Sequence, residues 1–147
     1  MKSLFDENVK EEIKHRINCL NEQSNPQWGK MNAPQMLFHC QFPLKIALKK
    51  DHPKIKPNLL AKLFFKKSLY NDKPWGKNLP TTPSLRVTED KKFDHEKQEL
   101  FALIEEFSNQ RDKTLWEPHP MFGKFTSEQW GKMQYKHLDH HLTQFDV

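Results

Sequence analysis

The sequence predicts an all-α protein, a single domain over residues 1–147 in which four long helices form a bundle. Apolar side chains recur every three or four residues in four segments, and no segment shows the alternation of a strand. Prolines cluster between the second and third segments, which indicates one long connection there. A chain of 147 residues has the usual size of one domain. Bundles of this kind hold cofactor sites between facing helices.

The first two helices are predicted at about residues 3–19, with a possible extension to 23, and at about 33–48. Asn32 is the expected N-cap of the second helix, with Pro34 in its first turn and Gln35 three residues on. Pro43 cannot donate the helical hydrogen bond to the carbonyl of His39. We therefore expect a kink in the second helix beside that histidine.

The third helix is predicted at about residues 90–109, with its apolar stripe facing inward and Glu96 largely outside. The fourth begins at Thr126, where Thr126 and Gln129 fit a capping box, and ends at Phe145. The connection between the second and third helices contains a short amphipathic helix over residues 59–70. Prolines then keep residues 73–85 extended. The apolar loop at residues 116–123 is expected to pack over a neighbouring element.

Two histidines near the end of the chain, His137 and His141, have the spacing that brings side chains to one face of a helix. Both fall in or beside the apolar stripe of the fourth helix, whereas Lys132 and Lys136 fall on the opposite arc. Two imidazoles at this spacing can grip one metal ion. The alternative is a pair of core histidines with ordinary hydrogen bonds. We favour metal, because an unpaired buried group costs about 1–3 kcal/mol.

A third ligand is predicted on the second helix, where His39 points from the middle of an apolar face. Cys40 lies about 100° round the helix from His39, so the two are not expected to bind one ion. A small buried apolar role is favoured for Cys40.

Composition and charge narrow the classes of function. Hydrophobic residues make up only 35% of the chain, so the core must rely on 11 Phe and 4 Trp. No stretch reaches the about 18 apolar residues of a membrane span, no signal-peptide pattern is present, and Cys19 and Cys40 form no disulfide framework, which favours the cytoplasm. Residues 45–77 hold ten lysines against two aspartates. This basic segment is favoured as a solvated face rather than a nucleic-acid or membrane site, because it contains no arginine.

The histidine pattern resembles that of the DinB/YfiT-like family, whose four-helix members carry one histidine on the second helix and an HxxxH on the last. One branch of that superfamily, a domain of unknown function, is similar over nearly the whole chain. The shared motifs are Trp-Gly-Lys-Met at 28–31, His-Pro-x-Phe-Gly at 119–123, Glu-x-Trp at 128–130 and His-x-x-His-His-x-x-Gln-Phe at 137–145.

The resemblance implies a metal-dependent enzyme with a divalent ion held by His39, His137 and His141. Related families use such an ion to activate a low-molecular-weight thiol for transfer or isomerisation, and others are hydrolases. We expect Zn or Ni rather than Mg, because imidazole suits the former. The resemblance also implies a homodimer, which would let some of the many aromatic side chains be buried between subunits.

Five further residues are candidates for the surroundings of the site. Gln144 lies one turn beyond His141, where it could bond to a ligand or face substrate, and an ordinary structural role is equally favoured. Gln35 lies one turn before His39, although capping is the favoured role. His140 is a candidate outer or substrate-facing group, and His119 and Trp116 are candidates for closing the mouth of the site. No carboxylate falls on the ligand face, so the sequence names no general base.

The function predicted is thiol transfer or hydrolysis of a small molecule, with transfer slightly favoured. One alternative is a non-enzymatic metal-binding or stress-response module. The other is docking of the basic segment on an anionic membrane or nucleic acid, to which the aromatic residues among its lysines would contribute.

Overall fold

The computed structural model describes residues 1–50, 55 and 59–147 of the chain, and within them it is all-helical. The five α-helices are α1 (Glu7–Asn18), α2 (Ala33–Ala47), α3 (Leu59–Phe65), α4 (Phe93–Ser108) and α5 (Ser127–Gln144). Two 3₁₀ turns, η1 (Lys66–Leu69) and η2 (Pro83–Leu85), lie in the long connection between α2 and α4. Part of the predicted long connection lies outside the described residues, namely Pro53, Pro57 and two lysines of the basic segment, Lys54 and Lys56.

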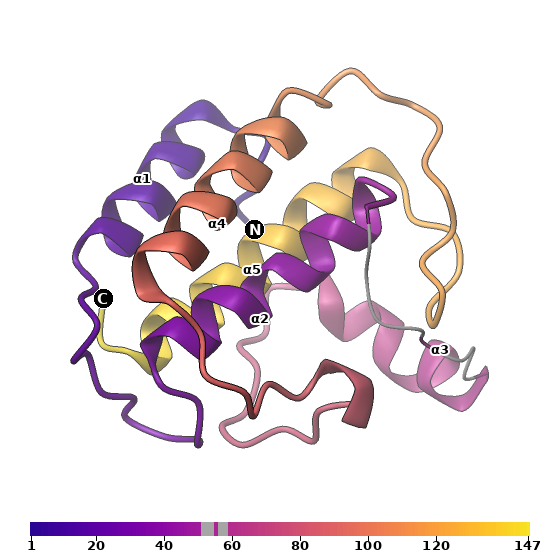
Figure 1. Cartoon of the computed structure of the whole chain (residues 1–147). Helices are drawn as coiled ribbons and strands as arrows, with labels where there is room; N and C mark the ends of the chain where they lie inside the picture. Colours follow the sequence, from indigo (N-terminus) through magenta and orange to yellow (C-terminus); the bar gives the residue numbers. More distant parts are fainter. Residues whose placement is uncertain (51–54, 56–58) are drawn as a thin grey trace.

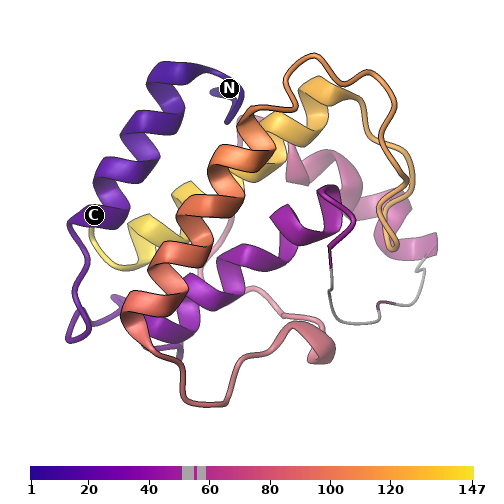
Figure 2. The same ribbon diagram turned by 45° about the horizontal axis from the view of Figure 1, so that its top comes forward.

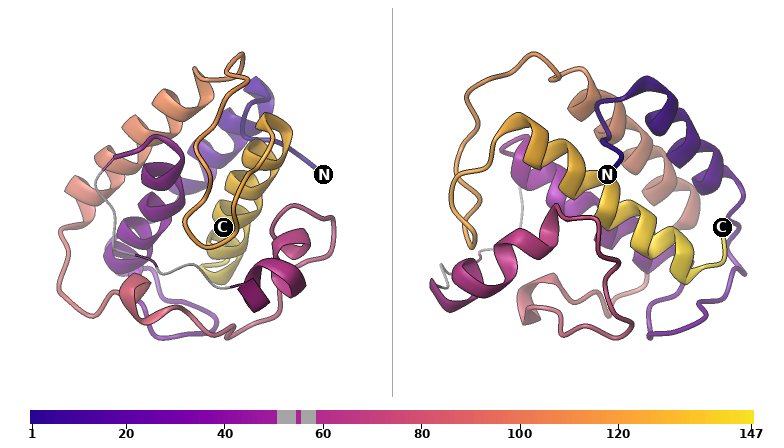
Figure 3. Two further views of the ribbon diagram at one scale, coloured as in Figure 1. Left: turned by 90° about the vertical axis from the view of Figure 1, so that its right-hand side faces the viewer. Right: turned by 180° about the vertical axis from the view of Figure 1, so that it is seen from behind.

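The four long helices pack side by side, and α3 lies at the edge of the molecule (Figure 1). Helix α2 contacts both α4 and α5, and α1 contacts the same two helices. The tilted view shows α4 running between α1 and α2 (Figure 2). Seen from behind, α5 lies in front and the α3 segment projects to one side (Figure 3). None of the described helices has the length and apolar character needed to cross a membrane.

The predicted caps of α2 and α5 are confirmed. Asn32 accepts a hydrogen bond from the backbone N–H of Gln35, and the Gln35 side chain accepts from the N–H of Asn32. Thr126 and Gln129 make the same reciprocal pair before α5. Each capping box satisfies two backbone donors that the first helical turn leaves open. The two helices that carry the histidines therefore begin within a residue of the sequence prediction.

Helix α1 begins later than predicted, at Glu7 instead of about Ser3. Residues 3–5 cross α5 at Gly131, where the N–H of Leu4 donates to the Gly131 carbonyl at 3.0 Å. A Cβ at Gly131 would lie 2.3 Å from the Ser3 hydroxyl oxygen, so this crossing requires glycine. The Leu4 carbonyl accepts from the Ser108 hydroxyl of α4 at 3.1 Å, so both backbone groups of Leu4 are bonded to other helices instead of to a first helical turn.

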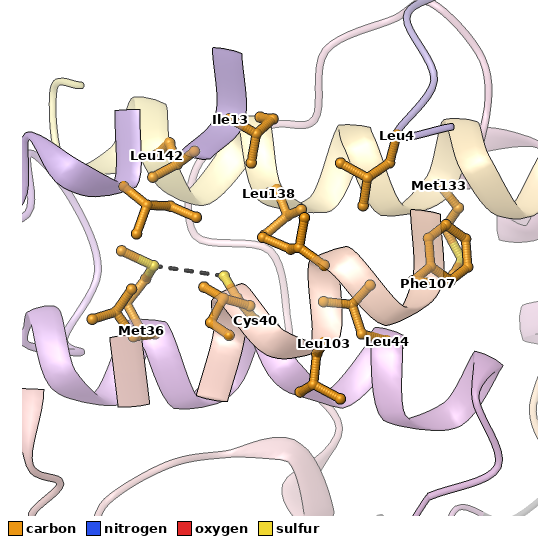
Figure 4. Close-up of a cluster of buried hydrophobic side chains, with 14 of the residues drawn as sticks. Leu4, Ile13, Met36, Cys40, Leu44, Leu103, Phe107, Met133, Leu138 and Leu142 are labelled. Atoms are coloured by element: carbon orange, nitrogen blue, oxygen red, sulfur yellow. Dashed lines mark hydrogen bonds between the residues drawn. The ribbon is translucent and has the colours of Figure 1, made fainter. Parts of the chain in front are cut away.

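The core lies between α1, α2, α4 and α5 and includes both apolar and aromatic side chains (Figure 4). Leu44, Phe107, Trp130 and Leu138 are each no more than 1% exposed. Cys40 is buried beside Met36, with 3.6 Å between the two sulfur atoms, and burial raises the pKa of its thiol. This agrees with the apolar role predicted for Cys40.

Two charged residues, Glu96 and Lys136, were predicted from helical periodicity to face solvent. Both are buried, so this prediction was wrong. Glu96 on α4 is only 5% exposed, and its carboxylate accepts a hydrogen bond from Gln41 Nε2 at 2.7 Å. Lys136 on α5 is 6% exposed because η1 and the residues after it cover that side of the helix. Its ammonium donates to the carbonyls of Ser68 and Asn71 and to Asn71 Oδ1, at 2.7–2.8 Å. Desolvation lowers the pKa of this lysine.

The connection is less regular than predicted. The amphipathic helix expected over residues 59–70 is split into α3 and η1, and the segment expected to be extended over 73–85 ends in the 3₁₀ turn η2. Four large apolar side chains of α3 are exposed by 61–73%: Leu60, Leu63, Phe64 and Phe65. Lys136 of α5 donates to the Ser68 carbonyl and so fixes η1 against α5. The indole N–H of Trp75 donates to the same carbonyl.

Replacing Lys136 with methionine is expected to destabilise the protein by about 1–3 kcal/mol, because the three hydrogen bonds of its ammonium to Ser68 and Asn71 would be lost. Chemical denaturation of the variant would measure this loss. Lys132→Met is the matched control, since Lys132 lies one turn away and pairs with the exposed carboxylate of Glu128. Its expected cost is below about 0.5 kcal/mol. Equal costs for both variants would contradict a structural role of Lys136.

A candidate metal centre between α2 and α5

His39 is presented by the middle of α2, which runs through Pro43 to Ala47. The side chain is 6% exposed, and its ring lies edge-on to Phe42 with 5.8 Å between centroids. His39 Nδ1 lies 3.1 Å from the carbonyl oxygen of Leu85, the last residue of η2. A carbonyl can only accept, so Nδ1 carries the proton and Nε2 keeps its lone pair.

His137 and His141 lie one turn apart on α5 and face His39 across the contact between α2 and α5. The three ring centroids are separated by 4.7–5.1 Å. One ring nitrogen from each histidine lies within 4.8 Å of the others, an arrangement that could hold a metal ion. His39 Nε2 and His137 Nε2 are 3.2 Å apart. The structure thus brings together the three histidines that the sequence predicted as ligands.

Gln144 contacts His141 directly. Its Oε1 lies 2.9 Å from His141 Nδ1, and its Nε2 donates to the carbonyl of Trp28 at 2.6 Å. His141 therefore carries its proton on Nδ1 and keeps the lone pair of Nε2. Gln144 thus forms a hydrogen bond to one of the three predicted ligands.

Burial lowers the pKa of all three imidazoles. Desolvation is the main cause at each histidine, and the neighbouring histidines lower the pKa of His137 and His141 further. The pKa of His141 falls to about 3, and that of His137 lies well below its ordinary value. The three rings are consequently neutral at physiological pH, which is the form that binds a metal ion.

The arrangement of these nitrogens fits a metal ion. Two imidazole nitrogens bound tetrahedrally at the usual Zn–N length of about 2.0–2.1 Å are about 3.3–3.4 Å apart, close to the 3.2 Å between His39 and His137. Without a cation, His137 Nε2 must carry a proton and donate to His39. That proton would leave His137 Nδ1 as a bare acceptor, and this buried atom has no partner among the described residues. A cation in place of this proton would leave the proton of His137 on Nδ1, which would still lack a partner among the described residues. The fit to a metal ion therefore rests on the spacing of the nitrogens.

Two indole rings flank His140, the half-buried residue beside His141. Its ring lies 5.8 Å from Trp28 and 5.5 Å from Trp75, measured between centroids. The Trp75 ring also lies 6.1 Å from His137. The Lys77 ammonium sits 4.7 Å from the centroid of Trp28. His140 thus lies beside the three histidines, between two aromatic side chains that come from separate connections.

The remaining sequence candidates lie elsewhere. Gln35 caps α2, the role favoured for it, and also donates to the Glu89 carbonyl at 3.2 Å. His119 packs against Trp130, and its Nδ1 accepts from the N–H of Met121. Trp116 also packs on Trp130 and donates to the Ser127 hydroxyl. Trp130 is seven residues before His137, about 10 Å along the helix. His119 and Trp116 therefore pack the loop onto the start of α5 instead of closing the mouth of the site.

The described lysines of the basic segment are partly engaged within the protein. Lys49 pairs with Glu117 and Lys50 with Glu106, at 2.7 and 2.9 Å. Lys66 donates to the carbonyl of Lys124, and Lys77 stacks on Trp28.

Sequence reasoning missed the backbone groups that orient the histidines. The carbonyls of Leu85 and Trp28 both come from connections, and neither carries a side-chain signal. Gly29 offers a weak one: its φ is +84°, which favours glycine, and a Cβ there would lie 2.5 Å from Gln144 Nε2. The glycine of the Trp-Gly-Lys-Met motif is therefore explained by its approach to Gln144.

Comparison with known proteins gives one match. The model of a family described as a protein of unknown function (DUF1569) matches residues 2–147, which is nearly the entire chain. No curated protein and no solved structure matches the chain.

Proposed function

Since the chain belongs to the DUF1569 family, whose description assigns no reaction, we propose from its site that it is a metal-dependent enzyme of the DinB/YfiT type. His39, His137 and His141 would hold one divalent ion, Zn or Ni, between α2 and α5. The four long helices would then correspond to the DinB-type bundle, and the connection holding α3 and η1 to its long crossover.

The observation that carries the proposal is the convergence of three neutral imidazoles. In two of them, His39 and His141, the Nδ1 atom already donates to an acceptor of the protein. Leu85 and Gln144 accept from Nδ1 of His39 and His141, so both Nε2 atoms are left as lone pairs. Outer hydrogen bonds of this kind accompany most metal-binding histidines. The His39 lone pair faces His137 Nε2 at 3.2 Å, and one ring nitrogen from each of the three histidines lies within 4.8 Å of the others, so a single ion could take up all three lone pairs.

The ligand set favours an anionic nucleophile. No carboxylate or cysteine belongs to the group formed by the three histidines in the described part of the chain. Three neutral ligands leave the charge of a divalent ion uncompensated, which favours thiolate or hydroxide in the remaining positions. The ion would supply the lowered pKa that makes a bound thiol or water nucleophilic at neutral pH. His39, His137 and His141 hold and orient it, and the Trp28 and Trp75 rings beside His140 would contact a small substrate.

Thiol transfer and hydrolysis remain the two candidate reactions, and they are separable by experiment. Metal-loaded protein would be supplied with a panel of low-molecular-weight thiols and an electrophile, and separately with ester and amide substrates. We expect thiol conjugation above the uncatalysed rate, reduced to background in His39→Ala and unchanged in a variant of the exposed His15, His15→Ala. Metal-dependent hydrolysis with no effect of thiol would instead favour a hydrolase. Full metal occupancy without either activity would favour a non-enzymatic metal-binding role.

A further inference from the structure

Gln144 joins the candidate ligand His141 to the turn at residues 27–29. It is 4% exposed, and its side chain is satisfied at both ends: Oε1 accepts from His141 Nδ1, and Nε2 donates to the carbonyl of Trp28. Its backbone carbonyl also accepts from the N–H of Gln27 at 2.7 Å. The end of α5 is thus bound to this turn through both the main chain and the side chain of one residue.

The Trp28 carbonyl decides which way the Gln144 amide faces. A flipped amide would place Oε1 2.6 Å from the carbonyl oxygen, so two acceptors would face each other without a proton between them. The NH₂ group must therefore point to Trp28, and Oε1 must point to His141. Because Oε1 can only accept, the proton of His141 is held on Nδ1, and the lone pair of Nε2 remains available.

Gly29 permits this contact. Its φ of +84° lies in the left-handed region, and a Cβ would lie 2.5 Å from the Gln144 amide nitrogen. Any side chain at this position would have to push either the turn or the amide away. The turn therefore approaches Gln144 closely only because residue 29 is glycine.

We propose that Gln144 is a positioning residue for the metal ligand His141, and that the Trp28–Gly29 turn fixes its amide in the orientation this requires. The inference rests on the proposed metal site. In this proposal Trp28, Gly29 and Gln144 together hold His141 in one tautomer and one ring orientation before an ion binds. Metal binding then loses no free energy to fixing that tautomer and orientation.

The test compares two buried glutamines of α5. Gln144→Leu removes the acceptor for His141. Gln134→Leu is the matched control, because Gln134 is 1% exposed and donates to the Pro43 carbonyl at 2.8 Å. Zn²⁺ affinity would be measured by competition with a chromophoric chelator on untagged protein. We expect Gln144→Leu to weaken Zn²⁺ binding about 10–100-fold, and Gln134→Leu to leave it within about twofold even if both variants unfold more easily.

A second readout needs no metal. In the metal-free protein, ¹⁵N-detected NMR of the histidine rings should show His141 protonated on Nδ1 in the native sequence and a mixture of tautomers in Gln144→Leu. Gln144→Glu keeps an acceptor for His141 but replaces the donor to the Trp28 carbonyl with an oxygen. It should retain the Nδ1–H tautomer, because the carboxylate oxygen still accepts from Nδ1. Gly29→Ala leaves Gln144 in the chain but should reproduce both effects of Gln144→Leu, which keeps the test decisive if the leucine variant does not fold.

The outcomes separate this inference from the proposed function. Native protein that binds no Zn²⁺ would overturn the metal site. Native protein that binds Zn²⁺, together with Gln144→Leu and Gly29→Ala variants that bind it equally well and keep the His141 tautomer, would overturn the positioning role alone.

Discussion

Replacing His39 or His141 with alanine is expected to remove most of the binding of one equivalent of Zn²⁺ or Ni²⁺ per chain. Each substitution deletes one of the three imidazoles that converge between α2 and α5. The affinity for the metal ion should fall by more than the roughly 10–100-fold that follows the removal of a hydrogen-bond partner of a ligand. Metal analysis of untagged protein, together with titration of each chelator-treated variant, measures the effect.

Two histidine variants serve as controls for this result. His140→Ala changes a residue next to His141 whose ring lies between Trp28 and Trp75, and it should retain the bound metal. His15→Ala changes an exposed residue of α1 and should have no effect. Unchanged metal content in both His39→Ala and His141→Ala would refute the three-histidine site. Loss of metal in His140→Ala but not in His137→Ala would mean that a different pair of α5 histidines binds the ion.

The stability of the metal-free protein is expected to fall steeply with acid. The pKa values of His39, His137 and His141 are lowered in the folded chain, to about 3 for His141, whereas an unfolded histidine keeps its ordinary pKa of about 6.5. Below pH 6.5 these three histidines bind protons in the unfolded chain but remain neutral in the folded chain. Stability that is fully present above pH 6.5 is therefore lost as the pH falls toward 3, by up to about 1.4 kcal/mol per pH unit for each histidine.

Urea denaturation between pH 6.5 and 5.5 measures this dependence, since carboxylates of ordinary pKa stay mostly ionised in this window. His137→Leu removes one titrating group, so the pH slope of its unfolding free energy should be smaller than that of the native chain by up to about 1.4 kcal/mol per unit. The exposed His15→Ala variant should keep the native slope. A His137→Leu slope identical to the native one would show that His137 is not held neutral in the fold.

The sequence was sufficient to predict those features that depend on residues close together in the chain. The capping boxes at Asn32 and Thr126 involve residues three apart, and the starts of α2 and α5 agree with the prediction within a residue. The spacing of His137 and His141 is likewise a property of one helix, so their common face could be predicted without knowing what they face. His39 needed one further step, because its apolar face indicated only that it points inward.

Tertiary structure decided what covers each helix and which groups complete the site. The phase of α5 placed Lys136 opposite the core, yet η1 and the residues after it bury that side, and a connection's path is not encoded in helical periodicity. The partners of His39 and His141 depend on the Leu85 and Trp28 carbonyls, which lie 46 residues from His39 and 116 from Gln144. Every residue carries a carbonyl, so only the packing of the connections against α2 and α5 determines which ones orient the histidines.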